Sequence, residues 1–116
     1  MLYHYKAKVV RIVDGDTVEL QVDLGFYVTY KHAFRLADIN APEIRTKDQE
    51  EKKEGMAAKE ALEKLLPVGS EVSITTEKTG KYGRWLAHLY VDAGEPKVRV
   101  YVNEEMVKLG HAKWMK

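Results

Sequence analysis

Three short segments of the sequence contain side chains that could act on a phosphate group. The first, residues 14–17, has the sequence DGDT and presents two carboxylates at a turn, where a glycine allows unusual backbone angles and hard cations find oxygen ligands. Taken alone, this pattern is more typical of an ordinary turn between two strands. The segment becomes a candidate metal site only if other segments supply matching chemistry.

The second and third segments supply cations, together with acidic and amide side chains. Residues 35–43, with the sequence RLADINAPE, combine an arginine with acidic and amide side chains and a proline that makes the local turn rigid. Residues 79–84, with the sequence TGKYGR, contain two glycines that let the backbone approach an anion, and their cations and tyrosine suit a nucleotide. A solvated strand end and a hairpin tip would explain the same two segments.

The elements that must position these segments are mostly strands. Alternation in the third strand predicts that Phe34 and Leu36 face the core while Arg35 faces out. A later strand contains Trp85, Leu89 and Tyr90, which we interpret as core residues rather than as a platform for bases. The predicted strands, from their β-rich and alternating patterns, are at about 6–13, 17–24, 28–37, 70–77 and 85–91, with an extension through 97–102.

Two helices are predicted among these strands. Residues 44–55 are charged and poor in apolar side chains, and the start of this stretch is predicted to be a mobile surface loop. An amphipathic helix follows and ends at Pro67. A short closing helix is predicted with Asn103 as its N-cap and Gly110 at its end. One helix after the third strand favours an α+β, mainly β fold, a five-stranded OB-type barrel, because closure removes exposed strand edges.

Composition limits the function classes without choosing one. The chain has 116 residues, which suits a single domain over 1–116, and its 45% hydrophobic and 32% charged residues are typical of a folded, soluble protein. A net charge of +1 lacks the strongly basic balance that is usual in nucleic-acid-binding proteins. No apolar run approaches the ~20 residues that span a bilayer, so no membrane association is expected. The N-terminus lacks a signal-peptide pattern, so we expect a cytoplasmic protein or an already mature secreted form.

Taken together and in this order, the three segments resemble the signature blocks of the staphylococcal nuclease (thermonuclease) family. The resemblance extends over about residues 6–114 and includes the helix after the charged segment. It implies an OB barrel and a calcium-dependent hydrolase that cleaves DNA and RNA, preferably single-stranded, and leaves 3′-phosphate ends. Carried over by position, it implies that Arg35 and Arg84 clamp the scissile phosphate and that Glu43 positions or deprotonates the attacking water. Lys81 and Tyr82 would then bind a flanking part of the substrate.

The same resemblance implies a Ca²⁺ site. Its ligands would be Asp16, the side chain of Asn40 and the carbonyl of Ala41. Asn40 departs from the family, which typically has an aspartate there, so one negative charge is missing. If the chain is still extended at this point, Asp38 shares a face with Asn40 and restores that charge, directly or through water.

Two other classes of function remain open. One is a non-catalytic module on the same barrel that binds nucleic acid or protein, and the other is a structural component without nucleic-acid affinity. Retention of Arg35, Glu43 and Arg84 favours the enzyme, because a pure binder does not need a base beside two guanidinium groups. The sequence ends shortly after the closing helix, so we also expect some exposed apolar barrel surface, which favours a homodimer or marginal stability.

Overall fold

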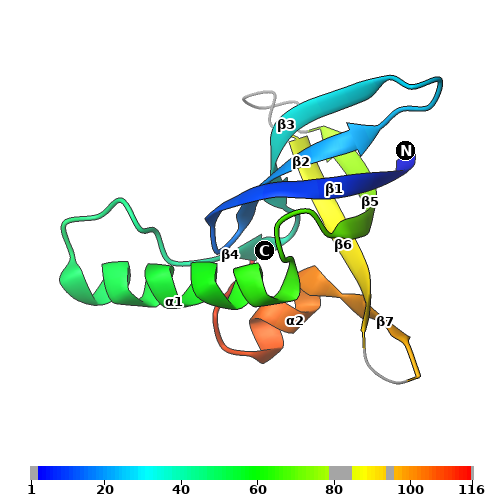
Figure 1. Ribbon diagram of the computed structural model, residues 1–116. Helices are drawn as coiled ribbons and strands as arrows, with labels where there is room; N and C mark the ends of the chain where they lie inside the picture. The colour runs from blue at the N-terminus through cyan, green and yellow to red at the C-terminus, as the bar shows by residue number, and fades with distance from the viewer. Residues whose placement is uncertain (1–2, 79–84, 94–95, 116) are drawn as a thin grey trace.

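The computed structural model describes residues 3–78, 85–93 and 96–115 (Figure 1). Among these residues, no helix combines the length and the apolar character that crossing a membrane requires. The elements in chain order are β1 (Tyr3–Asp14), β2 (Thr17–Asp23), β3 (Thr29–Leu36), β4 (Ile39–Asn40), α1 (Gln49–Leu65), β5 (Glu71–Lys78), β6 (Trp85–Ala93), β7 (Val98–Tyr101), α2 (Val102–Lys108) and β8 (Lys113–Trp114).

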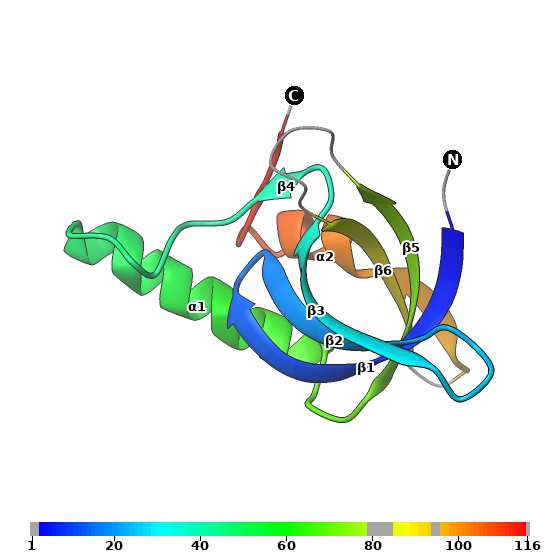
Figure 2. The same ribbon diagram turned by 90° about the horizontal axis from the view of Figure 1, so that it is seen from above.

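Five strands close into a barrel, which confirms the predicted mainly β, OB-type fold. The main sheet has the order β3-β2-β1-β5-β6-β7, and each neighbouring pair is antiparallel. The barrel closes where β3 pairs with β6 in parallel, with Arg35 opposite Leu86. In Figure 2 the strands curve around a common interior. Among the described residues β7 pairs only with β6, so it is not part of the closed ring.

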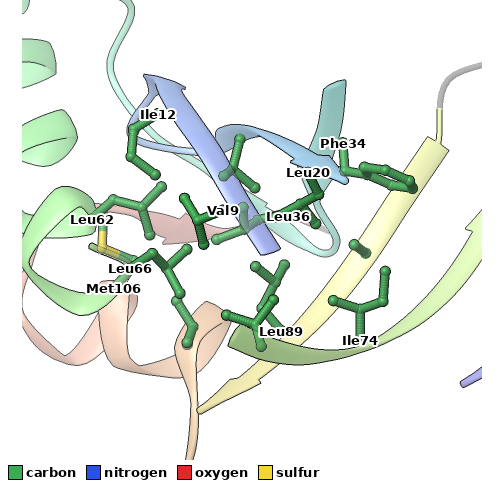
Figure 3. Packing of buried hydrophobic residues seen from close by; sticks show 14 of the residues in the cluster. Val9, Ile12, Leu20, Phe34, Leu36, Leu62, Leu66, Ile74, Leu89 and Met106 are labelled. Atoms are coloured by element: carbon green, nitrogen blue, oxygen red, sulfur yellow. The ribbon is translucent and has the colours of Figure 1, made fainter. Parts of the chain in front are cut away.

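The barrel interior and the space beneath the helices form one apolar core. Figure 3 shows Val9 and Leu36 from the strands packed near Leu62, Leu66 and Met106 from the helical side. This continuity explains why both helices lie at one end of the barrel, since each buries an apolar stripe against the open end of the strands (Figure 1).

Strand alternation confirms most of the predicted inward positions. Phe34 and Leu36 are buried, and Arg35 between them is only partly buried on the outer side. Leu89 is in the core, as predicted, and Trp85 is partly buried against it. The prediction is wrong for Tyr90, because the period of two places it on the face opposite Leu89, outside the apolar core.

The start of the charged stretch, residues 44–48, contains no helix or strand, as predicted, but helix α1 begins at Gln49, earlier than the sequence indicated. Asp48 is the N-cap, and its side chain accepts hydrogen bonds from the backbone N–H groups of Glu50 and Glu51 at 3.0 and 3.4 Å. The two glutamates also suit the positive end of the helix dipole. A cap and favourable charges therefore support a helical turn that lacks apolar contacts, and this part of α1 extends beyond the barrel in Figures 1 and 2.

Helix α2 ends as predicted but begins differently. Gly110 has a positive φ of 81°, and its N–H donates to the carbonyl of Val107 while that of His111 donates to Met106, both at 3.0 Å. This pair of bonds is a Schellman motif, in which glycine is favoured. The prediction of Asn103 as N-cap is wrong, because the cap is Tyr101, which makes no side-chain capping bond.

Asn103 is instead fully buried between two strands. Its Oδ1 accepts a hydrogen bond from the N–H of Leu89 at 3.1 Å, and its Nδ2 donates to the carbonyls of Ala37 at 2.9 Å and Ala87 at 3.1 Å. A buried backbone group without a partner costs about 1–3 kcal/mol. Asn103 therefore satisfies three groups where β3 ends beside β6, and joins α2 to the barrel closure.

Candidate active site

A polar cavity of about 680 Å³ lies where the β1–β2 turn, the end of β3, β4 and the start of β6 meet. It brings together residues from two of the three sequence segments that suggested phosphate chemistry. The predicted site residues that line it are Asp16, Arg35, Asn40, Ala41 and Glu43.

The register of the β2–β3 hairpin places Asp16 beside Arg35. Thr17 is directly opposite Arg35 in that register, and the N–H of Leu36 donates to the carbonyl of Asp16 at 2.7 Å. Nη2 of Arg35 consequently lies 3.6 Å from Oδ2 of Asp16, with the two side chains 22% and 12% exposed. This mostly buried pair is screened less by solvent than an ion pair on the surface.

Asp16 also holds the segment between β4 and Glu43 in place by a hydrogen bond. Its Oδ2 accepts a hydrogen bond from the backbone N–H of Ala41 at 3.0 Å, and its Oδ1 accepts one from the hydroxyl of Thr17 at 3.1 Å. The contact with Ala41 joins the β1–β2 turn to the segment after β4. One carboxylate thus ties together two of the cavity walls.

Asn40 also contacts the nitrogen of Arg35 that lies near Asp16. Its Oδ1 accepts a hydrogen bond from Nη2 of Arg35 at 2.9 Å. The same nitrogen donates to the carbonyl of Ile39 at 3.4 Å and lies 3.6 Å from Sδ of Met115. Because β4 pairs with β8, with Ile39 opposite Trp114, the position of Asn40 depends on the C-terminal part of the chain.

Asp38 does not share a face with Asn40, so that prediction is wrong. Its φ is +67°, a left-handed conformation that breaks the extended chain between β3 and β4. Its carbonyl accepts a hydrogen bond from the N–H of Met115 at 2.8 Å, and its side chain is exposed. Asp38 is not among the residues that line the cavity.

Glu43 lines the cavity as an exposed residue, and its backbone is placed by α1. A Cβ added to Gly55 would lie 2.8 Å from the carbonyl oxygen of Glu43 and 2.9 Å from that of Pro42. A Cβ at Gly15 would lie 2.5 Å from that of Ala58. Both glycines therefore permit a close approach of α1 to the cavity walls. Sequence reasoning missed Gly55, although an isolated glycine within a helix is a signal of close packing.

Three carboxylates, those of Asp14, Asp16 and Glu43, line the cavity. Burial raises the pKa of Asp14, the charge of Asp16 raises it further and that of Glu43 adds to this, while Arg45 and Lys59 act in the opposite direction. Sequence reasoning noted Asp14 in the DGDT turn but gave it no role. Trp85, which the sequence placed in the core, also contributes to the cavity wall.

Oxygen atoms of the kind that hard cations prefer line the cavity, and two of them, Oδ2 of Asp16 and Oδ1 of Asn40, contact Nη2 of Arg35. Asp16 supplies a carboxylate, Asn40 an amide oxygen, and Asp14 and Glu43 lie on the same cavity. Within the part of the chain that the structure describes, no three His, Cys, Asp or Glu side chains form a metal-binding group. A cation here would therefore need the amide, backbone carbonyls and water in addition to the carboxylates.

The third segment lies outside the described residues. Arg84, Lys81 and Tyr82 belong to it, so their predicted contacts with phosphate and substrate stay predictions. Of the described residues with predicted roles, all five line the cavity. The ligand role of the Ala41 carbonyl also stays a prediction, because the recorded contact of Ala41 is made by its N–H.

Comparison with known proteins assigns the family. The model of the family described as "Staphylococcal nuclease homologue" matches residues 33–116. The chain is 30% identical over 129 residues to an uncharacterized protein of Methanocaldococcus jannaschii, covering 95% of this chain and 59% of the relative. It is 32% identical over 110 residues to Protein ParB of Escherichia coli, covering 92% of this chain and 55% of the relative. The chain thus spans little more than half the length of these curated relatives. The chain belongs to the family of staphylococcal nuclease homologues.

Proposed function

We propose that the chain is a calcium-dependent nuclease that cleaves DNA and RNA, preferably single-stranded, to leave 3′-phosphate ends. The observation that carries the proposal is the single cavity of about 680 Å³ that Arg35, Asp16 and Glu43 line together. A guanidinium group, a candidate metal ligand and a candidate base are the parts that phosphodiester hydrolysis requires. Membership of the family supports the same assignment.

Arg35 is arranged to bind a phosphate without losing its orientation. Its recorded contacts within the described residues all involve Nη2. A guanidinium group has five N–H donors in a fixed plane, so Nε and Nη1 are left to donate to the phosphate oxygens. Attack on phosphorus increases the negative charge on those oxygens, and an arginine already in place stabilises it without reorganising. Arg84 would add the second guanidinium group.

Glu43 is the candidate base, because it is an exposed carboxylate on the cavity that holds Arg35. There it would orient a water molecule and accept its proton as the water attacks. Asp16 and Asn40, with the Ala41 carbonyl, would bind the calcium ion. When bound, calcium would supply positive charge that stabilises the phosphate oxygens during attack.

The proposal predicts cleavage of labelled single-stranded DNA and RNA in calcium and none in chelator. Replacing Glu43 by Ala should slow cleavage by about 10²–10⁴-fold through loss of the base. Replacing Arg35 or Arg84 by Ala should slow it by roughly 10²–10³-fold through loss of charge stabilisation. Glu63→Ala is the matched control, because Glu63 is an exposed α1 glutamate away from the cavity. End-group analysis of the products tests for the 3′-phosphate.

Three outcomes of that assay would contradict parts of the proposal. Cleavage that persists in chelator would remove the metal from the reaction. A folded Glu43→Ala chain that cleaves at the wild-type rate would remove Glu43 from the chemistry. Strand binding without any cleavage would favour the alternative of a non-catalytic binding module on the same barrel.

A further inference from the structure

A second depression, which we call the outer groove, lies on the outside of the barrel across β1, β5, β6 and β7. It has a volume of about 530 Å³, and the residues relevant here are His4, Lys6, Ser73, Thr75, Tyr90 and Arg99. No residue lines both the outer groove and the active-site cavity. The groove is therefore a separate surface, and the proposed cleavage reaction does not use it.

Tyr90 forms an aromatic wall of the outer groove. Its neighbours across the sheet are Tyr101 on β7 and Ser73 on β5. The Tyr101 ring stacks on that of Tyr90 with centroids 5.1 Å apart and an angle of 20° between the planes. Ser73 is too small to cover a tyrosine ring, so the aromatic row ends at Tyr90 and the groove begins there.

The Tyr101 ring is itself held in place by a contact with His88. Its hydroxyl lies 2.6 Å from Nδ1 of His88, which is on the neighbouring strand β6. The two rings are tilted by 32° with centroids 5.9 Å apart. Tyr90 is therefore supported by a row of ordered aromatic side chains. A ring fixed in this way loses little conformational entropy when a ligand stacks on it.

One cation, Arg99, lies over this ring, and a second, Lys6, lines the same groove. The guanidinium carbon of Arg99 lies 5.6 Å from the centroid of the Tyr90 ring, and Lys6 lines the groove beside the strand that carries Ser73. The groove-lining residues include no carboxylate. Oε1 of Glu71 lies 3.9 Å from Nζ of Lys6, but both side chains are more than 60% exposed. Such an exposed pair contributes little, so a phosphate could replace it.

We infer that the outer groove binds single-stranded nucleic acid, with a base stacked at Tyr90 and phosphates on Arg99 and Lys6. Aromatic side chains that point outward from a β-sheet stack unpaired bases, and neighbouring cations follow the backbone. A duplex does not expose the faces of its bases, and an apolar protein partner would not match a rim of cations. The groove would hold one part of a nucleic-acid strand while another part of the same strand is cleaved in the active-site cavity. The inference thus extends the proposed function.

The test is the affinity of the 116-residue chain for a labelled oligothymidine of about 12 nucleotides, within the roughly 4–16 that one OB fold covers, measured in chelator to prevent cleavage. Tyr90→Ala should weaken binding by about tenfold or more, whereas Tyr90→Phe should retain it because the ring is kept. Arg99→Ala should weaken binding and reduce the salt dependence by about 0.7 in the log–log slope, as expected for one phosphate contact to a single strand. Arg11→Ala is the matched control, because Arg11 is an exposed cation on β1 outside the groove.

The inference is overturned if folded Tyr90→Ala and Arg99→Ala chains bind the strand as tightly as the wild type. It is also overturned if a duplex of the same length competes as well as the single strand, because stacking requires unpaired bases. If Tyr90→Ala does not fold, the affinity of Arg99→Ala for the oligothymidine tests the inference by itself. Cleavage of a minimal diester with one phosphate reports on the catalytic cavity alone, and its rate should be unchanged in Arg99→Ala. This assay therefore separates two results: an outer groove that does not bind the strand, and a cavity that does not cleave.

Discussion

Asn40 and Asp16, the carboxylate that would bind calcium, both contact the arginine that would bind phosphate. Oδ1 of Asn40 is 2.9 Å from Nη2 of Arg35, and the same nitrogen is 3.6 Å from Oδ2 of Asp16. An amide at this position orients Arg35 without adding charge. The affinity of oxygen-ligand sites for calcium rises with the charge of the ligands. On the proposal that the cavity binds calcium, Asn40 would limit the affinity for the cation.

We expect Asn40→Asp to tighten calcium binding by about tenfold, equivalent to ~1.4 kcal/mol, because a second carboxylate would then act with Asp16. Asp38→Asn is the matched control and should leave binding unchanged, since Asp38 does not line the cavity. Calorimetric titration with calcium measures both variants. An Asn40→Asp chain that binds no more tightly would show that charge does not limit the site. Weaker binding by Asp38→Asn would place Asp38 near the metal after all.

Helix α1 shapes the cavity although it provides none of the proposed catalytic side chains. It approaches the β1–β2 turn through Gly15 and Ala58, and the Pro42–Glu43 backbone through Gly55. The contact at Gly55 involves backbone atoms, which cannot rotate away as a flexible side chain can. The position of Glu43 therefore depends on how closely α1 packs.

Gly55→Ala should both destabilise the chain and slow cleavage. The added methyl group would meet backbone atoms below 3.0 Å, and overpacking typically costs about 1–3 kcal/mol, more than the ~1 kcal/mol that alanine gains in a helix. Ala57→Gly is the control, because this exposed α1 position should lose a similar stability without moving Glu43. Urea unfolding and cleavage rates measure the two effects. A Gly55→Ala chain that is more stable and fully active would show that the close approach imposes no constraint.

The β2–β3 hairpin turn has a conformation that its residues disfavour. The N–H of Val28 donates to the carbonyl of Gly25 at 2.9 Å, and the two residues between them, Phe26 and Tyr27, have φ values of 55° and 63°. This is a type I′ turn, which favours Asn-Gly. Replacing Phe26 by Asn together with Tyr27 by Gly should raise the free energy of unfolding by about 1 kcal/mol or more, because left-handed backbone costs roughly 1–2 kcal/mol per residue. Denaturant unfolding without such a gain would mean that the aromatic side chains themselves stabilise the turn.

The stability of the whole molecule should fall in strong alkali through Tyr101. Burial, followed by the neighbouring Tyr90, Asp38, Glu104 and Glu77, raises the pKa of Tyr101 from 10.0 to about 12. The folded chain therefore retains this proton more tightly than the unfolded chain does. The resulting contribution to stability is complete below pH 10.0 and is lost as pH rises to about 12.

Urea unfolding measured across this pH range tests the prediction. The free energy of unfolding should fall more steeply with pH in the wild type than in Tyr101→Phe, which has no phenol to titrate. The difference between the two slopes isolates Tyr101 from the other tyrosines and the lysines. Equal slopes would show that Tyr101 titrates alike in the folded and unfolded states.

The homodimer and the single domain over 1–116 also stay predictions. Sedimentation over a range of concentrations tests for the homodimer.

Local chemistry alone determined several features of this protein. The period of two placed Phe34 and Leu36 inside and Arg35 outside, and the left-handed preference of glycine placed the end of α2 at Gly110. The order of strands and helices predicted the barrel, and the charged side chains of two segments proved to line one cavity. The burial pattern and the helix end depend on neighbouring residues, so the sequence carries them directly.

Only the tertiary structure decided which of these side chains contact one another. The pairing of Asp16 with Arg35 depends on the register of β2 with β3, and the separation of Asp38 from Asn40 depends on one left-handed residue. Asn103 resembled a helix cap because its sequence neighbours fit one, yet its partners are 14 to 66 residues away. Register, closure and close approach are set by contacts between distant segments, and periodicity along the chain does not encode them.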